Sequence, residues 1–226
     1  MIKNEVSCFP GYFTVYLSFY NIFYYVFDFL LVQNAPRETC QQRVDNIYDE
    51  CYDNKHCFGF HPTNPERCVD RKDCTMMTTL EFYRSFDDSV DIQLTATYSN
   101  ESEYIAMAFS DTSTMGKDLV FACSWSWPHR EECKVYWNEN FGGKSELLND
   151  KQKLPRVGCF VYRNGRFTVE FLLDIHVVVK GQEFDFEKGY YLLLARGLVK
   201  GDEIEKHTAK IISSVKFGID GVRKGN

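Results

Sequence analysis

The sequence predicts an all-β fold, an antiparallel β-sandwich, and three observations support this prediction. Hydrophobic and polar residues alternate over residues 90–98, which is the period of a half-buried strand. Further short apolar segments follow at regular spacing, with no helical period between them. Asn164-Gly165 separates two of these segments and suits the two positive-φ positions of a tight hairpin turn.

The predicted sandwich occupies residues 80–220. Each strand is expected where a short apolar segment is bounded by polar or turn-forming residues. After 90–98, these segments are residues 104–110, 119–126, 134–137, 157–163, 167–173, 189–195 and 210–217. Residues 36–79 are instead rich in Cys, Asn, Asp, Pro and Thr, and they are expected to form a Cys-rich N-terminal extension.

A nearly continuous aromatic and aliphatic run at residues 13–32 predicts that residues 1–35 are a signal peptide or an N-terminal signal anchor. Asp28 would be costly in the hydrocarbon of a bilayer, which favours cleavage over anchoring. A cleaved leader predicts a secreted, extracellular protein. An uncleaved leader would be its only membrane contact, with the domain in the lumen or outside the cell.

The cysteines are expected to form disulfides, because a secretory leader places them in an oxidising compartment. One of the nine, Cys8, lies within the leader, and the sequence leaves the pairing of the other eight open. These are Cys40, Cys51, Cys57, Cys68, Cys74, Cys123, Cys133 and Cys159. Zinc is the alternative, with Cys57, Cys68, Cys74 and His61 as ligands, but the chain has no Cys-x-x-Cys pair.

Charge and motifs exclude several classes of function. The formal net charge is −6 and no Lys/Arg cluster compensates locally, so nucleic acid is not expected as a partner. The sequence lacks a Gly-x-Ser-x-Gly elbow, a His-Glu-x-x-His motif and a phosphate-binding glycine loop. No independent catalytic site is therefore expected.

Several short motifs occur in one order along the chain. The segment expected at 104–110 ends in Ala108-Phe109-Ser110, and a polar turn then carries Met115-Gly116 before Asp118-Leu119-Val120. Around these lie the segment 57–68, Cys74, and the segments 135–138, 157–163, 189–197 and 203–207. This order resembles the DOMON domain family, in particular the DOMON domain of ferric-chelate-reductase-1-like proteins, over roughly residues 57–217.

The resemblance implies an immunoglobulin-like sandwich that binds haem b. It places the axial iron ligands at Met115 and His207, with His176 as a reserve ligand. A Met/His pair fills both axial positions and favours one-electron transfer, so an external redox partner is expected. The chain has no Cys-x-x-Cys-His motif, so the haem would be held noncovalently. The apolar residues expected to line the cavity are Phe109, Val120 and Leu194.

The alternative is a haem-free extracellular module that binds sugar or protein. In this interpretation Met115 fills a gap at the rim of the sandwich and His207 is an ordinary solvated histidine. Exposed aromatic side chains would then stack on sugar rings or on a partner protein, and the candidates are Trp125, Trp127, Tyr136 and Trp137. Asn100-Glu-Ser102 is an N-glycosylation motif, placed in a predicted hairpin turn.

Overall fold

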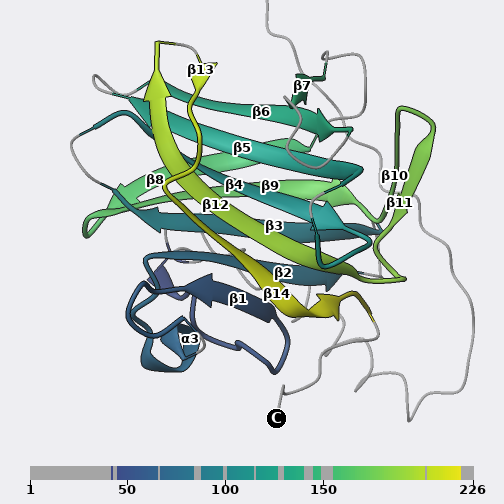
Figure 1. The fold of residues 1–226 in the computed structure, drawn as a ribbon. Coiled ribbons are helices and arrows are strands. Elements are labelled where there is room, and N and C mark those ends of the chain that lie inside the picture. The colour runs from purple at the N-terminus through teal and green to yellow at the C-terminus, as the bar shows by residue number, and fades with distance from the viewer. Residues whose placement is uncertain are drawn as a thin grey trace, which may run out of the picture. The chain divides into compact units, whose positions relative to one another are not determined.

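The structure, a computed structural model, describes residues 42, 45–65, 67–83, 88–98, 101–114, 116–126, 130–139, 145–148, 155–201 and 203–219. All of them belong to one compact unit, Thr39–Asn226. They include two antiparallel sheets, a small hairpin and the single-turn helix α3 (Cys68–Arg71) (Figure 1). The predicted antiparallel β-sandwich is confirmed. Among these residues no helix has the length and hydrophobicity needed to cross a membrane.

The first sheet has five strands. In spatial order they are β1 (His56–Phe60), β2 (Met76–Tyr83), β3 (Ser89–Thr97), β9 (Arg166–Asp174) and β8 (Arg156–Arg163). The β8–β9 turn is Asn164-Gly165, and both residues have positive φ, 51° and 70°, as the sequence predicts. Two strands of this sheet, β1 and β2, begin within the Cys-rich segment 36–79.

The second sheet has seven strands. Its main path is β13 (Glu203–Ile204), β12 (Tyr190–Lys200), β4 (Glu103–Ser110), β5 (Asp118–Ser126), β6 (Arg130–Asn138) and β7 (Glu146–Leu147). The last strand, β14 (Ala209–Phe217), pairs with β12 and runs beside it in Figure 1. Each expected segment corresponds to an observed strand, whereas β1, β2, β7, β13 and the hairpin strands β10 (His176–Val179) and β11 (Gln182–Asp185) were not predicted.

The hydrophobic core lies between the two sheets. Alternate residues of the facing strands point into it, as the two-residue period of a strand requires. It is rich in aromatic side chains, and its fully buried members include Phe109, Phe167, Phe171, Leu94, Met107 and Leu194. At one end Arg196 of β12 donates a 2.6 Å hydrogen bond to the Glu103 carboxylate and a 3.0 Å hydrogen bond to the Thr97 hydroxyl, which joins the two sheets.

One predicted turn is wrong. The segment between β3 and β4 was expected to close a hairpin, but these strands lie in different sheets, so the segment crosses from one sheet to the other. Crossing is favoured because β3 already pairs with β2 and β9, while β4 pairs with β5 and β12. Asn100, the predicted glycosylation site, lies outside the described residues.

Disulfides tie the N-terminal extension together and link two strands of the second sheet. The pairs are Cys51–Cys57, Cys68–Cys74 and Cys123–Cys133. Cys159 is also disulfide-bonded, while Cys40 and the predicted leader, residues 1–35, lie outside the described residues. The zinc alternative is wrong, because the bonds take up the sulfur atoms of Cys57, Cys68 and Cys74.

Candidate functional site

The outer face of the seven-stranded sheet carries a row of small side chains. Ala106 of β4 lies opposite Ala195 of β12 on one side and opposite Ala122 of β5 on the other. We call these three residues the alanine row. Tyr104, Val120 and Tyr136 flank it in a hydrophobic cluster that is separate from the core. Methyl groups are short, so the row extends less far above the sheet than the side chains that flank it, and Ala106 and Ala122 are themselves only 7% and 4% exposed.

His207 lies at the edge of this face, in the irregular segment between β13 and β14, residues 205–208, which we call the bulge. The Glu205 amide donates a 3.0 Å hydrogen bond to the carbonyl of Leu198, and the Thr208 amide donates a 2.8 Å hydrogen bond to the carbonyl of Arg196. Ile204 pairs with Val199 and Ala209 pairs with Arg196, so the four residues 205–208 lie opposite only two residues of β12, Gly197 and Leu198. Such a bulge re-aims side chains that a regular strand would place elsewhere.

Gly197 is required for this arrangement. A Cβ atom added at Gly197 would lie 2.8 Å from Cε1 of Tyr104 and 3.1 Å from Cα of His207. The bare Gly197 backbone therefore gives the Tyr104 ring and the His207 backbone room to pack against it. The Tyr104 hydroxyl crosses this position and donates a 3.1 Å hydrogen bond to the carbonyl of Glu205.

The electrostatic environment keeps His207 neutral. Burial lowers the pKa of its imidazole, and the nearby charges of Lys210 and Lys206 lower it further. A neutral imidazole has a free lone pair, which is the form that binds a metal. Burial also raises the pKa of Tyr104 to about 12, so its hydroxyl remains a donor at physiological pH. His207 is thus half-buried and available as a ligand, rather than fully solvated.

The second predicted ligand, Met115, lies outside the described residues, but the turn that contains it is largely described. The Ser110 hydroxyl donates a 3.2 Å hydrogen bond to the carbonyl of Thr114, and the Gly116 amide donates a 2.8 Å hydrogen bond to the buried Asp118 carboxylate. The turn therefore begins and ends against the ends of β4 and β5.

The two ligand-bearing segments meet the sheet at different points of β4. His207 lies beside Tyr104, and the turn starts at Ser110, six positions further along the strand. Extended strand of this length spans roughly 20 Å at about 3.3 Å per residue. One iron ion bound by both ligands therefore requires the turn to reach back over Ala108 and Ala106, whose side chains are small.

Two of the three expected lining residues are not on this face. Phe109 and Leu194 are buried between the sheets, whereas Val120 belongs to the cluster around the alanine row. The error has a simple cause. Successive side chains of a strand point to opposite faces, and both faces of β4 are buried, so hydrophobicity alone does not show which face a residue takes.

Burial also limits the aromatic surface proposed for sugar binding. Trp125 and Trp137 are 4% and 3% exposed and belong to the core, so they are not available for stacking on a ligand. Tyr136 is partly buried on the outer face, and Trp127 lies outside the described residues. The predicted group of exposed aromatic side chains is therefore wrong for its two buried tryptophans.

The other histidines occupy different settings. His56 is buried in β1 between the rings of Phe82 and Phe217. His61 makes a 2.9 Å hydrogen bond with the Thr63 hydroxyl. His176, the reserve ligand, is the first residue of β10 and is exposed.

Sequence reasoning missed three features of the face: Tyr104, Gly197 and the alanine row. A signal existed for the row, since alanines alternate with larger residues in Ile105-Ala106-Met107-Ala108 and recur at Ala122. The local sequence does not predict the bulge, because the bulge depends on how β12 pairs with β13 before it and with β14 after it.

Comparison with known proteins gives a sequence relative and similar solved structures. The "Putative ferric-chelate reductase 1 homolog" of Drosophila melanogaster is 27% identical over 166 residues, which is 72% of this chain and 24% of that protein. The chain thus spans about a quarter of the length of the curated relative that it matches. The cytochrome domain of Myriococcum thermophilum cellobiose dehydrogenase matches with a TM-score of 0.49 and 11% identity, over 72% of this chain and 82% of that chain. No family model matches.

Proposed function

Since this chain is a DOMON-like domain, we propose that it binds haem b between Met115 and His207 and carries single electrons. The observation that carries the proposal is the position of His207, held in a bulge over Gly197 at the edge of the alanine row. Its neutral imidazole would supply one ligand to the haem iron, and the thioether of Met115 would supply the other. The name of the sequence relative, a ferric-chelate reductase homolog, agrees with a redox role.

The described face fits a planar, largely apolar cofactor. The alanine row presents only methyl groups over three neighbouring strands. Tyr104, Val120 and Tyr136 give apolar contacts beside it. A Met/His donor set is one that proteins use for haem iron in electron transfer. The residues present therefore suit the group in their apolar character and in donor chemistry.

Each residue has a defined task in this proposal. Haem held by two protein ligands supplies reversible one-electron chemistry and has no open site for a substrate. Tyr104 and Gly197 hold the bulge in place, so they position His207 without touching the iron. Lys206 and Lys210 disfavour protonation of His207 and thereby keep it available as a ligand.

We place the protein outside the cell or in the lumen of the secretory pathway. Seven described cysteines are disulfide-bonded, which is typical of oxidising compartments. Glycosylation at Asn100 and processing of residues 1–35 belong to the same proposal. The electron donor and acceptor are external, and a ferric chelate is the acceptor class that the relative's name suggests.

A haemin titration tests this function. The full chain, produced through the secretory pathway of a eukaryotic host, should bind one haemin, and Met115→Leu and His207→Ala should each lower the affinity at least about tenfold. His61→Ala is the matched histidine control and should bind like the parent. A folded protein that takes up no haemin, or one whose affinity is the same in all variants, would overturn the proposal.

A further inference from the structure

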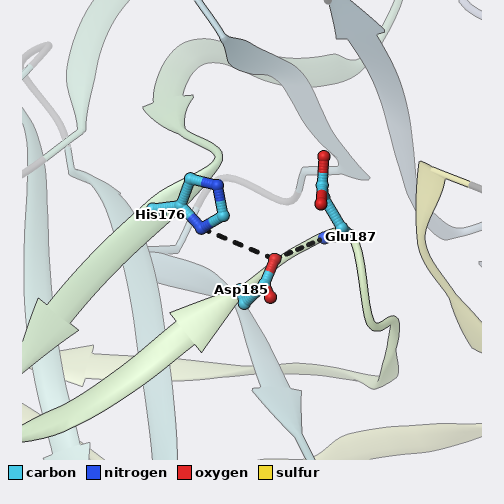
Figure 2. A group of neighbouring side chains, drawn as sticks. All are labelled: His176, Asp185 and Glu187. Carbon is cyan, nitrogen blue, oxygen red and sulfur yellow. Dashed lines mark hydrogen bonds and ion pairs between the residues drawn. The ribbon is translucent and has the colours of Figure 1, made fainter.

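Three possible metal ligands gather at the open end of the β10–β11 hairpin. His176, the first residue of β10, lies directly opposite Asp185, the last residue of β11. Glu187 follows two residues later, and its amide donates a 3.1 Å hydrogen bond to the Asp185 carboxylate. Figure 2 shows the imidazole and both carboxylates at this end of the hairpin.

The hairpin holds these residues rigidly. Its turn is Lys180-Gly181, with φ of 49° and 80°, the positive values that a two-residue hairpin turn requires. Side chains on one face of the hairpin are buried in the sandwich core; they are Val177, Val179, Phe184 and, just after it, Phe186. With the turn and the buried face fixed, the register cannot slip, so His176 and Asp185 stay opposite each other.

Asp185 is largely buried and differs in this from an ordinary acidic residue of the surface. Its side chain is only 12% exposed, and its amide donates a 2.9 Å hydrogen bond to the hydroxyl of the buried Tyr190. A hydrogen bond from Lys188 lowers the pKa of the carboxyl, and the amide of Glu187 and the charge of His176 lower it further, against the opposing effect of burial. The carboxylate is therefore ionised at neutral pH, as a ligand must be.

We propose that His176, Asp185 and Glu187 bind one divalent transition-metal ion. Their ligand atoms lie within 4.8 Å of one another, and Nδ1 of His176 is 3.5 Å from the Asp185 carboxylate. Ligands around one zinc ion are roughly 3–3.5 Å apart when each bond is about 2.0–2.2 Å long. His176 and Glu187 are exposed, so small side-chain rotations close the set, and water fills the remaining positions.

The ligand types select the class of ion. Imidazole is a good ligand for zinc, copper, nickel and iron, whereas calcium and magnesium prefer oxygen ligands alone. One imidazole with two carboxylates therefore favours Zn²⁺-like ions over Ca²⁺ and Mg²⁺. Metal binding at this cluster does not depend on haem, because the proposed haem ligands are Met115 and His207. His176 is only the reserve ligand.

Lys188 is the natural competitor of the metal. Its ammonium group lies 2.9 Å from Oδ2 of Asp185, on the oxygen that does not face His176. A cation at this position repels a metal ion and competes with it for the Asp185 carboxylate. Removing this charge should therefore strengthen metal binding, an outcome that a merely structural role of the cluster does not predict.

Calorimetric titration of the haem-free full chain with Zn²⁺ tests the site, with Ca²⁺ as the comparison ion. The parent should bind one Zn²⁺ whose signal is lost or weakened at least about tenfold in His176→Ala and Asp185→Asn. Lys188→Met should bind roughly three- to tenfold more tightly. His61→Ala, which removes a histidine elsewhere on the surface, should leave this binding unchanged.

Backbone amide NMR locates the ion independently of affinity. Saturating Zn²⁺ should shift the amides of residues 174–188 and leave those of β1 and β8 in place. Absence of Zn²⁺ binding, binding that survives in His176→Ala, or weaker binding in Lys188→Met would each overturn the proposal. Shifts centred on other histidines would overturn it too, because they indicate adventitious binding.

Discussion

The Tyr104 hydroxyl donates a 3.1 Å hydrogen bond to the backbone carbonyl of Glu205, a residue 101 positions away in the sequence. This contact joins β4 to the bulge that carries His207. It passes over Gly197, whose missing side chain allows the approach. The position of the proposed haem ligand is therefore fixed by long-range contacts rather than by the sequence around His207.

Tyr104→Phe should loosen this bulge without emptying the site. The change removes one hydrogen bond and leaves the ring, so the free energy of unfolding should fall by about 0.5–1.5 kcal/mol. Haemin affinity should fall as well, because His207 loses a restraint. Tyr136→Phe is the matched control, since β6 lies two strands beyond β4 in the sheet. Denaturant unfolding and haemin titration of both variants check this prediction, and equal effects of the two changes would contradict it.

Gly197→Ala should be more damaging than Tyr104→Phe. The added methyl group would lie 2.8 Å from the Tyr104 ring and 3.1 Å from the His207 backbone, so one of them must move. Overpacking of this kind typically lowers the free energy of unfolding by about 1–3 kcal/mol. The double variant Gly197→Ala/Tyr104→Ala makes room for the methyl group. If Gly197→Ala lowers haemin affinity no less in the Tyr104→Ala background than in the parent, the clash with Tyr104 is not the cause.

Stability should fall in mild acid because of His56. Its pKa is lowered by burial, although a hydrogen bond with the Gly218 backbone partly opposes this, and its Nε2 has no hydrogen-bond partner among the described residues. The folded state thus binds a proton less readily than the unfolded chain, whose histidine pKa is about 6.5. The contribution of neutral His56 to the free energy of unfolding should be fully present above about pH 6.5 and should decrease as the pH falls below that value.

His56→Phe isolates this effect. Phenylalanine fits among the rings of Phe82 and Phe217 and does not titrate, so the decrease between about pH 6.5 and 5.5 should become smaller. His207, whose pKa is also lowered, should retain a contribution of the same sign. His61→Ala should keep the full decrease. Unfolding curves over this pH range give the comparison, and an unchanged pH dependence in His56→Phe would rule out His56 as its source.

The strands of the sandwich could be predicted from the sequence, but their faces could not. Alternation identified β3, and Asn164-Gly165 identified the β8–β9 turn. In β4 every residue is buried, so the two faces differ only in which layer covers them. Phe109 was therefore assigned to the cofactor face although it points into the core.

Pairing between distant strands also could not be predicted from local sequence patterns. The hairpin β10–β11 is short and was not predicted. The sequence therefore did not show that His176 lies opposite Asp185. The bulge at His207 arises because β12 pairs first with β13 and then, two positions out of step, with β14. His207 could be proposed as a ligand because its motif resembles a family pattern, whereas the residues that pack around it could not be predicted.

Breaking the ion pair between Arg196 and Glu103 should destabilise the end of the sandwich near His207. Both side chains are largely buried, 17% and 9% exposed, and Nη2 of Arg196 is 2.6 Å from the carboxylate. Arg196→Met leaves a buried carboxylate without the guanidinium, so the free energy of unfolding should fall by about 3–5 kcal/mol. Adding Glu103→Leu should recover much of this loss. A double variant as unstable as the sum of the single changes would contradict a coupled pair.

The most direct test of haem binding is a reduced-minus-oxidised absorption spectrum of the full chain, secreted by a eukaryotic host supplied with haemin. Ligation by Met115 and His207 predicts sharp bands of low-spin haem b that are lost in both Met115→Ala and His207→Ala, because each variant removes one ligand of the iron. A folded, colourless protein would contradict it. Bands that persist in His207→Ala would contradict the assignment of that histidine as a ligand.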